Sequence, residues 1–82
     1  MMTPAEVKSI LDAEPRLAAM AQDGCGVTVE ELEGRARVSL TAPCAVKLMK
    51  CTVYAKSALP VESTWMFKQR STGLFVAHLS VN

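Results

Sequence analysis

The apolar positions at the start of the chain recur at helical spacing. Thr3 and Glu6 form a capping box, in which each side chain accepts a hydrogen bond from the other residue's backbone N–H, and Pro4 fits the first helical position. An apolar stripe follows, made of Val7, Ile10 and Leu11. The pattern predicts a helix over about residues 4–13.

A second short helix is expected directly after the first. Pro15 interrupts the hydrogen-bond ladder of the first helix and is itself a suitable first residue for the next one. The apolar residues expected to turn inward are Leu17, Ala18 and Met20. The glycine-bearing loop at residues 23–26 should end this helix.

Residues 27–40 support two interpretations. Thr28 and Glu31 form a second capping box before Leu32, which favours a short helix over about residues 29–36. The alternation of apolar and polar residues favours instead a strand from residue 27, a hairpin turn at 33–34 and a second strand over 35–40. We take the helix as the expected structure and keep the hairpin as the alternative.

The longest helical window runs from residue 42 to residue 57. Thr41 is a suitable cap, Pro43 suits a first turn, and no breaker occurs before Pro60. One apolar stripe consists of Ala42, Val46, Met49 and Val53, and a mixed, cationic face consists of Cys44, Lys47, Cys51 and Tyr54 with Lys50 beside it. A strand over residues 45–58 is the alternative, because Thr52, Val53 and Tyr54 favour sheets.

The end of the chain has the period of a sheet. Two segments with alternating side chains, residues 65–70 and 74–81, flank a short turn that contains Gly73. This pattern predicts a C-terminal β-hairpin with a polar, basic tip.

Composition limits the classes of function. The chain has 82 residues, half of them hydrophobic but few aromatic, which predicts one small domain over residues 1–82 that binds at its surface. No apolar run is long enough for a membrane span and no signal peptide is recognisable, so we expect a soluble, cytoplasmic protein without a membrane partner. The three cysteines, 19 and 7 positions apart, fit neither paired disulfides nor a metal site. With one histidine, His78, and no convergent acid, base or nucleophile, we expect neither an enzyme nor a cofactor.

Charge is divided along the chain. Residues 1–34 carry seven acids and two bases, a formal charge of −5, whereas residues 35–82 carry seven bases and one acid, a formal charge of +6. A domain with this division can turn a cationic surface toward a polyanion.

The order of these expected elements resembles the winged helix-turn-helix superfamily. The short helix opening at Thr28, the turn at Val38 and Ser39 and the long helix after Thr41 carry the resemblance, together with the closing hairpin. It implies an α+β fold of three helices followed by a C-terminal β-hairpin wing.

The resemblance also implies a small DNA-binding regulator. Residues 42–57 would enter the groove of double-stranded DNA, residues 65–81 would form the wing, and the protein would be a homodimer. The residues implied as DNA contacts are Arg35, Arg37, Cys44, Lys47, Lys50, Tyr54, Lys68, Gln69 and Arg70. The alternative is an α+β protein-interaction or inhibitor module that docks a partner without nucleic acid.

Overall fold

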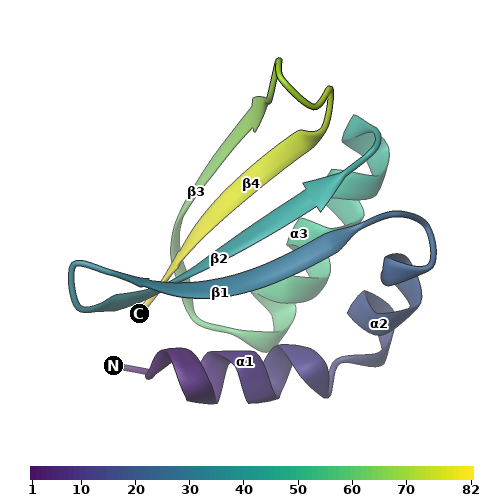
Figure 1. Cartoon of the computed structure of the whole chain (residues 1–82). Helices are drawn as coiled ribbons and strands as arrows, with labels where there is room; N and C mark the ends of the chain where they lie inside the picture. Colours follow the sequence, from purple (N-terminus) through teal and green to yellow (C-terminus); the bar gives the residue numbers. More distant parts are fainter.

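Four antiparallel strands form one sheet whose order is β1-β2-β4-β3, and three helices pack on one of its faces (Figure 1). The computed structural model describes residues 1–82. The elements are α1 (Pro4–Asp12), α2 (Pro15–Ala21), β1 (Gly26–Leu32), β2 (Arg35–Ala42), α3 (Ala45–Ala58), β3 (Val61–Lys68) and β4 (Phe75–Val81).

The two N-terminal helices are confirmed. The Thr3 backbone N–H donates to Glu6 Oε1 at 3.0 Å and the Glu6 backbone N–H donates to Thr3 Oγ1 at 3.2 Å, which completes the capping box at α1. Leu17 and Met20 are buried on α2 as expected, whereas Ala18 is exposed. Both helices form where local sequence signals are sufficient to start them.

The predicted helix over residues 29–36 is wrong, and the hairpin alternative is correct. Strands β1 and β2 are joined by a two-residue turn, in which Glu33 has φ +55° and Gly34 has φ +79°. Two positive φ values give a turn whose twist matches that of the flanking strands. The capping box at Thr28 is overridden because β1 gains a full ladder of hydrogen bonds along β2, which an isolated short helix cannot match.

The winged helix-turn-helix fold is also wrong. Two strands precede α3, and β4 pairs along its length with β2, so the C-terminal hairpin belongs to the central sheet and is not a projecting wing. Thr41 and Ala42 lie in β2 and do not open the long helix, which begins at Ala45 after Cys44. The hairpin itself is confirmed, with a tip over residues 69–74.

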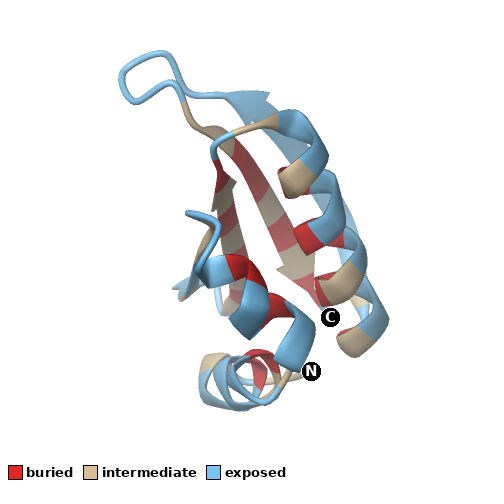
Figure 2. Cartoon of the chain, turned by 90° about the vertical axis from the view of Figure 1, so that its right-hand side faces the viewer, coloured by how far each residue is buried: buried red, intermediate tan, exposed pale blue.

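The core lies between the helices and the two central strands. Val38 lies opposite Leu79 and Leu40 opposite Ala77, and all four are fully buried. From the helices, α1 contributes Val7 and Leu11, and α3 contributes Leu48, Cys51 and Ala55. Figure 2 shows the buried residues concentrated where the helices face the central strands, while β3 is exposed from Glu62 to Lys68.

A substitution at Glu33 that relieves the strained backbone should stabilise the protein. Replacing Glu33 by Asn, which tolerates the left-handed backbone better than Glu, should raise the free energy of unfolding by about 0.5–1 kcal/mol. Urea denaturation measures the change. Glu31→Asn removes the same charge from an extended residue of β1 and should not stabilise the protein, so equal gains in both variants would contradict the turn-strain explanation.

Candidate functional site

Helix α3 turns three large apolar side chains away from the core. Val46, Met49 and Val53 are 60–64% exposed, whereas the side that faces the sheet consists of Leu48, Cys51, Thr52 and Ala55. Both sets have helical spacing, but Cys51 and Ala55 are small and let the helix axis approach β2 and β4 closely. Cys51, which the sequence suggested on the mixed, cationic face, is therefore buried.

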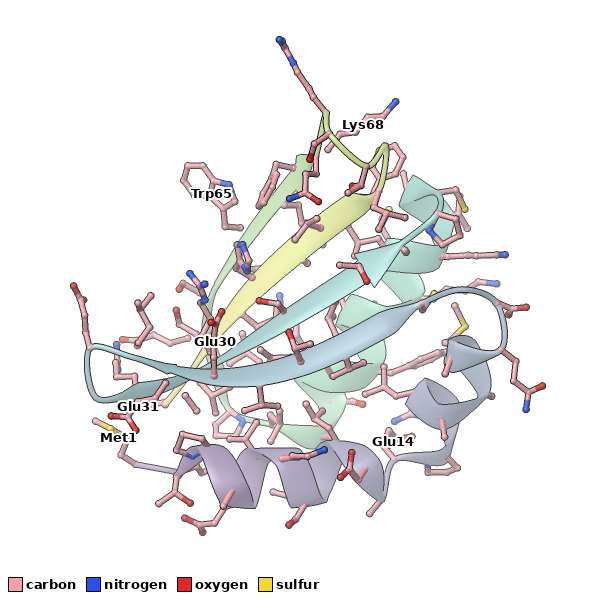
Figure 3. The ribbon with its side chains drawn as sticks, viewed as in Figure 1. Met1, Glu14, Glu30, Glu31, Trp65 and Lys68 are labelled. Carbon is pink, nitrogen blue, oxygen red and sulfur yellow. The ribbon has the colours of Figure 1, made fainter.

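Strand β3 forms one edge of the sheet and is covered by no helix. Residues 62–68 are all exposed, because α3 packs over β2 and β4 and stops short of β3. Trp65 is 70% exposed and, with Phe67, lies on the sheet face without helices, while Met66 lies on the helix side. Figure 3 shows the Trp65 ring standing away from β3 into solvent.

A shallow groove joins the exposed parts of α3 and β3. It has a volume of about 260 Å³, and Met49 and Met66 meet in its lining together with Ala45, Leu48, Phe67, Lys68 and Phe75. The groove therefore connects the exposed stripe of α3 with the edge strand, while Trp65 lies on the other face of that edge. We call the exposed apolar side chains of α3 and β3 together the apolar edge surface, and its members are Val46, Met49, Val53, Trp65, Met66 and Phe67.

The backbone of β3 leaves one row of polar groups without a partner strand. The Gln69 N–H donates to the Leu74 carbonyl at 2.8 Å, and the register continues without interruption back to Ser63 opposite Ser80. Since backbone groups alternate in direction along an antiparallel strand, residues 63, 65 and 67 point toward β4. The N–H and C=O groups of Thr64, Met66 and Lys68 point outward.

The sheet face without helices carries a polar cluster. Thr28, Ser39, His78 and Trp65 lie opposite one another across the four strands. Ser39 Oγ and His78 Nδ1 are hydrogen-bonded at 2.8 Å, and the rings of His78 and Phe67 have centroids 5.3 Å apart. Burial, reinforced by the nearby Arg37 charge, lowers the pKa of His78.

Ser39 and His78 are within reach of a nucleophile–base interaction that the sequence did not predict. A hydrolytic triad also needs an acid on the other ring nitrogen of the histidine. Glu30 instead approaches Ser39 Oγ at 3.5 Å and accepts a hydrogen bond from Arg37 Nε at 2.8 Å, which lowers the pKa of the Glu30 carboxyl. The cluster is therefore a network of hydrogen bonds between neighbouring strands and lacks the arrangement of a hydrolytic triad.

The residues predicted to contact DNA lie in three separate places. Arg35 and Arg37 lie on the helix-free face, paired with Glu62 and Glu30. The α3 group lies in the opposite layer and consists of Cys44, Lys47, Lys50 and Tyr54. Lys68, Gln69 and Arg70 lie at the β3–β4 end, which Figure 3 marks by Lys68, well away from Glu30.

Several of these side chains already have partners within the chain. Tyr54 lies beneath Arg16, whose guanidinium carbon is 4.8 Å from the ring centroid, and Cys44 is the half-buried N-cap of α3. Gln69 Oε1 accepts a hydrogen bond from Thr72 Oγ1 at 2.8 Å, and Lys68 Nζ lies 5.5 Å from the Phe75 ring centroid. These contacts give the residues structural roles at a helix end and in a turn.

The thiols show no arrangement for metal binding. Burial raises the pKa of the Cys51 thiol to about 12, with a further contribution from neighbouring Cys25, so Cys51 stays protonated at neutral pH. No group of three His, Cys, Asp or Glu side chains is placed to hold a metal ion.

A scan against protein-family models and searches of curated proteins and of solved structures each gave no match. None of the helices combines the length and the apolar character that a membrane crossing requires.

The lowered pKa of His78 should make the stability of the protein depend on pH. The pKa of His78 in the folded protein lies below the ordinary value of 6.5, so the unfolded chain binds more protons between the two values. The stability due to neutral His78 is therefore present above pH 6.5 and is lost as the pH falls toward the folded pKa. NMR titration of the ring protons should give the lowered pKa, and the loss of stability between pH 7.5 and 5.5 should be smaller in His78→Gln. Equal losses in both proteins would contradict this role.

Proposed function

We propose that the protein is a protein-interaction module that binds a partner through the apolar edge surface. The observation that carries the proposal is that six exposed, large apolar side chains of α3 and β3 lie along one edge of the domain, where Met49 and Met66 line a common groove. Contiguous exposed apolar surface is typical of interaction sites, because burying one such side chain fully contributes about 1.5–3 kcal/mol.

The backbone of β3 supports the same function. Its outward N–H and C=O groups at Thr64, Met66 and Lys68 can pair with an added strand. No proline lies within β3, and its one register irregularity is near its start, between Val61 and Ser63. Edge strands that avoid pairing usually carry proline, charges or bulges, and in β3 the charged residues, Glu62 and Lys68, lie near the two ends and leave the middle of the strand uncharged.

The distribution of side chains favours a protein partner over double-stranded DNA. The exposed side of α3 carries Val46, Met49 and Val53, with Lys50 and Lys56 beside them, so apolar side chains occupy much of the surface where a groove-binding helix needs polar contacts to bases. Arg35 and Arg37 are neutralised by neighbouring acids and lie in the other layer of the domain. Double-stranded DNA binding by a small regulator remains a prediction, now without the helix and wing geometry that motivated it.

Site-specific photo-crosslinking tests the proposed function. A photoreactive amino acid at position 53, on the apolar edge surface, should give discrete protein adducts in cells, and Met49→Asp in the same chain should reduce their yield at least tenfold. The matched control carries the photoreactive residue at exposed Ser9 on α1. Identical adducts from both positions, or adducts that do not respond to Met49→Asp, would refute a specific interaction through this surface.

One further observation favours a second candidate, the binding of single-stranded nucleic acid. The rings of Trp65, Phe67 and His78 share the helix-free face with Arg35 and Arg37. Exposed aromatic rings on a sheet can stack with unpaired bases, whereas the two arginines would have to leave Glu62 and Glu30 to contact the backbone.

Binding of a labelled oligothymidylate at low salt tests this candidate. Because stacking on one ring contributes about 1–3 kcal/mol, Trp65→Ala should weaken binding roughly fivefold to 150-fold by fluorescence anisotropy. A duplex of equal length provides the comparison, and Lys47→Glu with Lys50→Glu tests the predicted contacts of α3. No binding of the single strand would eliminate the candidate, while duplex binding that depends on the two lysines would restore the DNA prediction.

A further inference from the structure

Strand β3 is complementary to itself when two copies run antiparallel. With Met66 opposite Met66 of a second copy, Trp65 falls opposite Phe67 and Thr64 opposite Lys68. Trp65 and Phe67 lie on the same face of β3, as opposed residues of paired strands must. Each apolar residue in the middle of the strand then has an apolar neighbour across the new pair.

The hydrogen-bonding groups fit the same register. The outward-pointing residues of β3 are Thr64, Met66 and Lys68, and this pairing places each of them opposite an outward-pointing residue of the second copy. A shift by one residue would place side chains of opposite faces against each other. A shift by two, with Trp65 at the centre, would place Phe67 opposite Ser63, and a shift by four, with Thr64 at the centre, would place Trp65 opposite Ser63.

Charge at the ends of the pair is also compatible. Within β3, no like charges oppose each other, because Lys68 of one copy lies opposite Thr64 of the other. Beyond the paired segment, Glu62 has its own partner in Arg35, and Arg70 lies in the turn after the strand. Like charges placed directly opposite would destabilise paired strands.

Helix α3 extends the self-complementary surface. Tyr54 faces α2 beneath Arg16, and Met49 lines the groove beside Met66, so the Val46, Met49 and Val53 stripe is turned outward on the β3 side of the helix. A two-fold axis perpendicular to the sheet at Met66 leaves both α3 helices on one side of the joined sheet. Each helix stays over its own β2 and β4, so the two apolar stripes border the new strand pair from opposite sides of the axis without packing against each other.

We propose that the occupant of the apolar edge surface is a second copy of this chain, joined by antiparallel β3–β3 pairing into a sheet that continues through both subunits. This inference rests on the proposed function, because it names the partner of that same surface. A two-fold interface requires one patch to be complementary to itself, a condition that an unrelated partner would not impose on β3.

Sedimentation equilibrium at micromolar concentrations should give twice the monomer mass for the unaltered chain. Met66→Lys places two ammonium groups together on the axis and should weaken the dimer at least a hundredfold. Leu32→Lys introduces the same charge at an exposed leucine of β1, the other edge strand, and should still give the mass of the dimer. Circular dichroism verifies that both variants fold.

A cysteine at the axis provides an independent measurement. Paired Cα atoms in hydrogen-bonded positions are about 5.5 Å apart, which suits a disulfide. Met66→Cys should therefore form a covalent dimer under mild oxidation that neither Leu32→Cys nor the unaltered chain forms.

Each other outcome has a definite meaning. A monomer without Met66→Cys crosslinking, combined with Met49-dependent adducts to a different protein at position 53, would overturn the second copy as partner but retain the proposed function. The absence of both dimer and adducts would overturn both proposals. A dimer that survives Met66→Lys, without Met66→Cys crosslinking, would place the interface elsewhere and overturn β3 pairing.

Discussion

The pairing of β2 with β4 is the contact on which the architecture depends. It joins two local hairpins, separated in the chain by α3, into one sheet, and it aligns Val38 with Leu79 and Leu40 with Ala77 beneath the helices. Because α3 connects β2 to β3, it lies over the central strands and buries its small residues there. The single helix is too narrow to reach β3, so the same arrangement that closes the core leaves one edge of the sheet uncovered.

Local signals predicted the local structure correctly. The capping box at Thr3, the proline at position 15 and the turn at Gly73 each act within a few residues, and the two helices and the hairpin they predict are present. The capping box at Thr28 failed because its competitor, the ladder between β1 and β2, draws on residues up to Thr41. The position of β4 between β2 and β3 has no local signal, so the order of elements alone suggested the wrong fold.

The apolar edge surface could not be predicted from the sequence, for a related reason. Helix α3 has two stripes of residues with the same helical spacing. The more hydrophobic stripe would be expected to face the core, but it is the exposed one. The size of Cys51 and Ala55 was the available signal, since small residues permit close approach to a sheet. Trp65 was recognised as a strand residue, but its exposure follows from the edge position of β3, which only the pairing of β2 with β4 determines.

The division of charge along the chain has a different meaning in three dimensions. Glu30 from the acidic half pairs with Arg37 from the basic half across β1 and β2, so part of the charge difference between the halves is neutralised within the sheet. What survives at the outer edge of β1 is negative, with exposed Glu31 in the strand and Glu33 in the turn that follows it. Charged side chains on an edge strand disfavour its pairing with another edge. In the proposed β3-paired dimer, the joined sheet would end on both sides in β1 strands that carry these acids, which would favour a closed pair over a fibre.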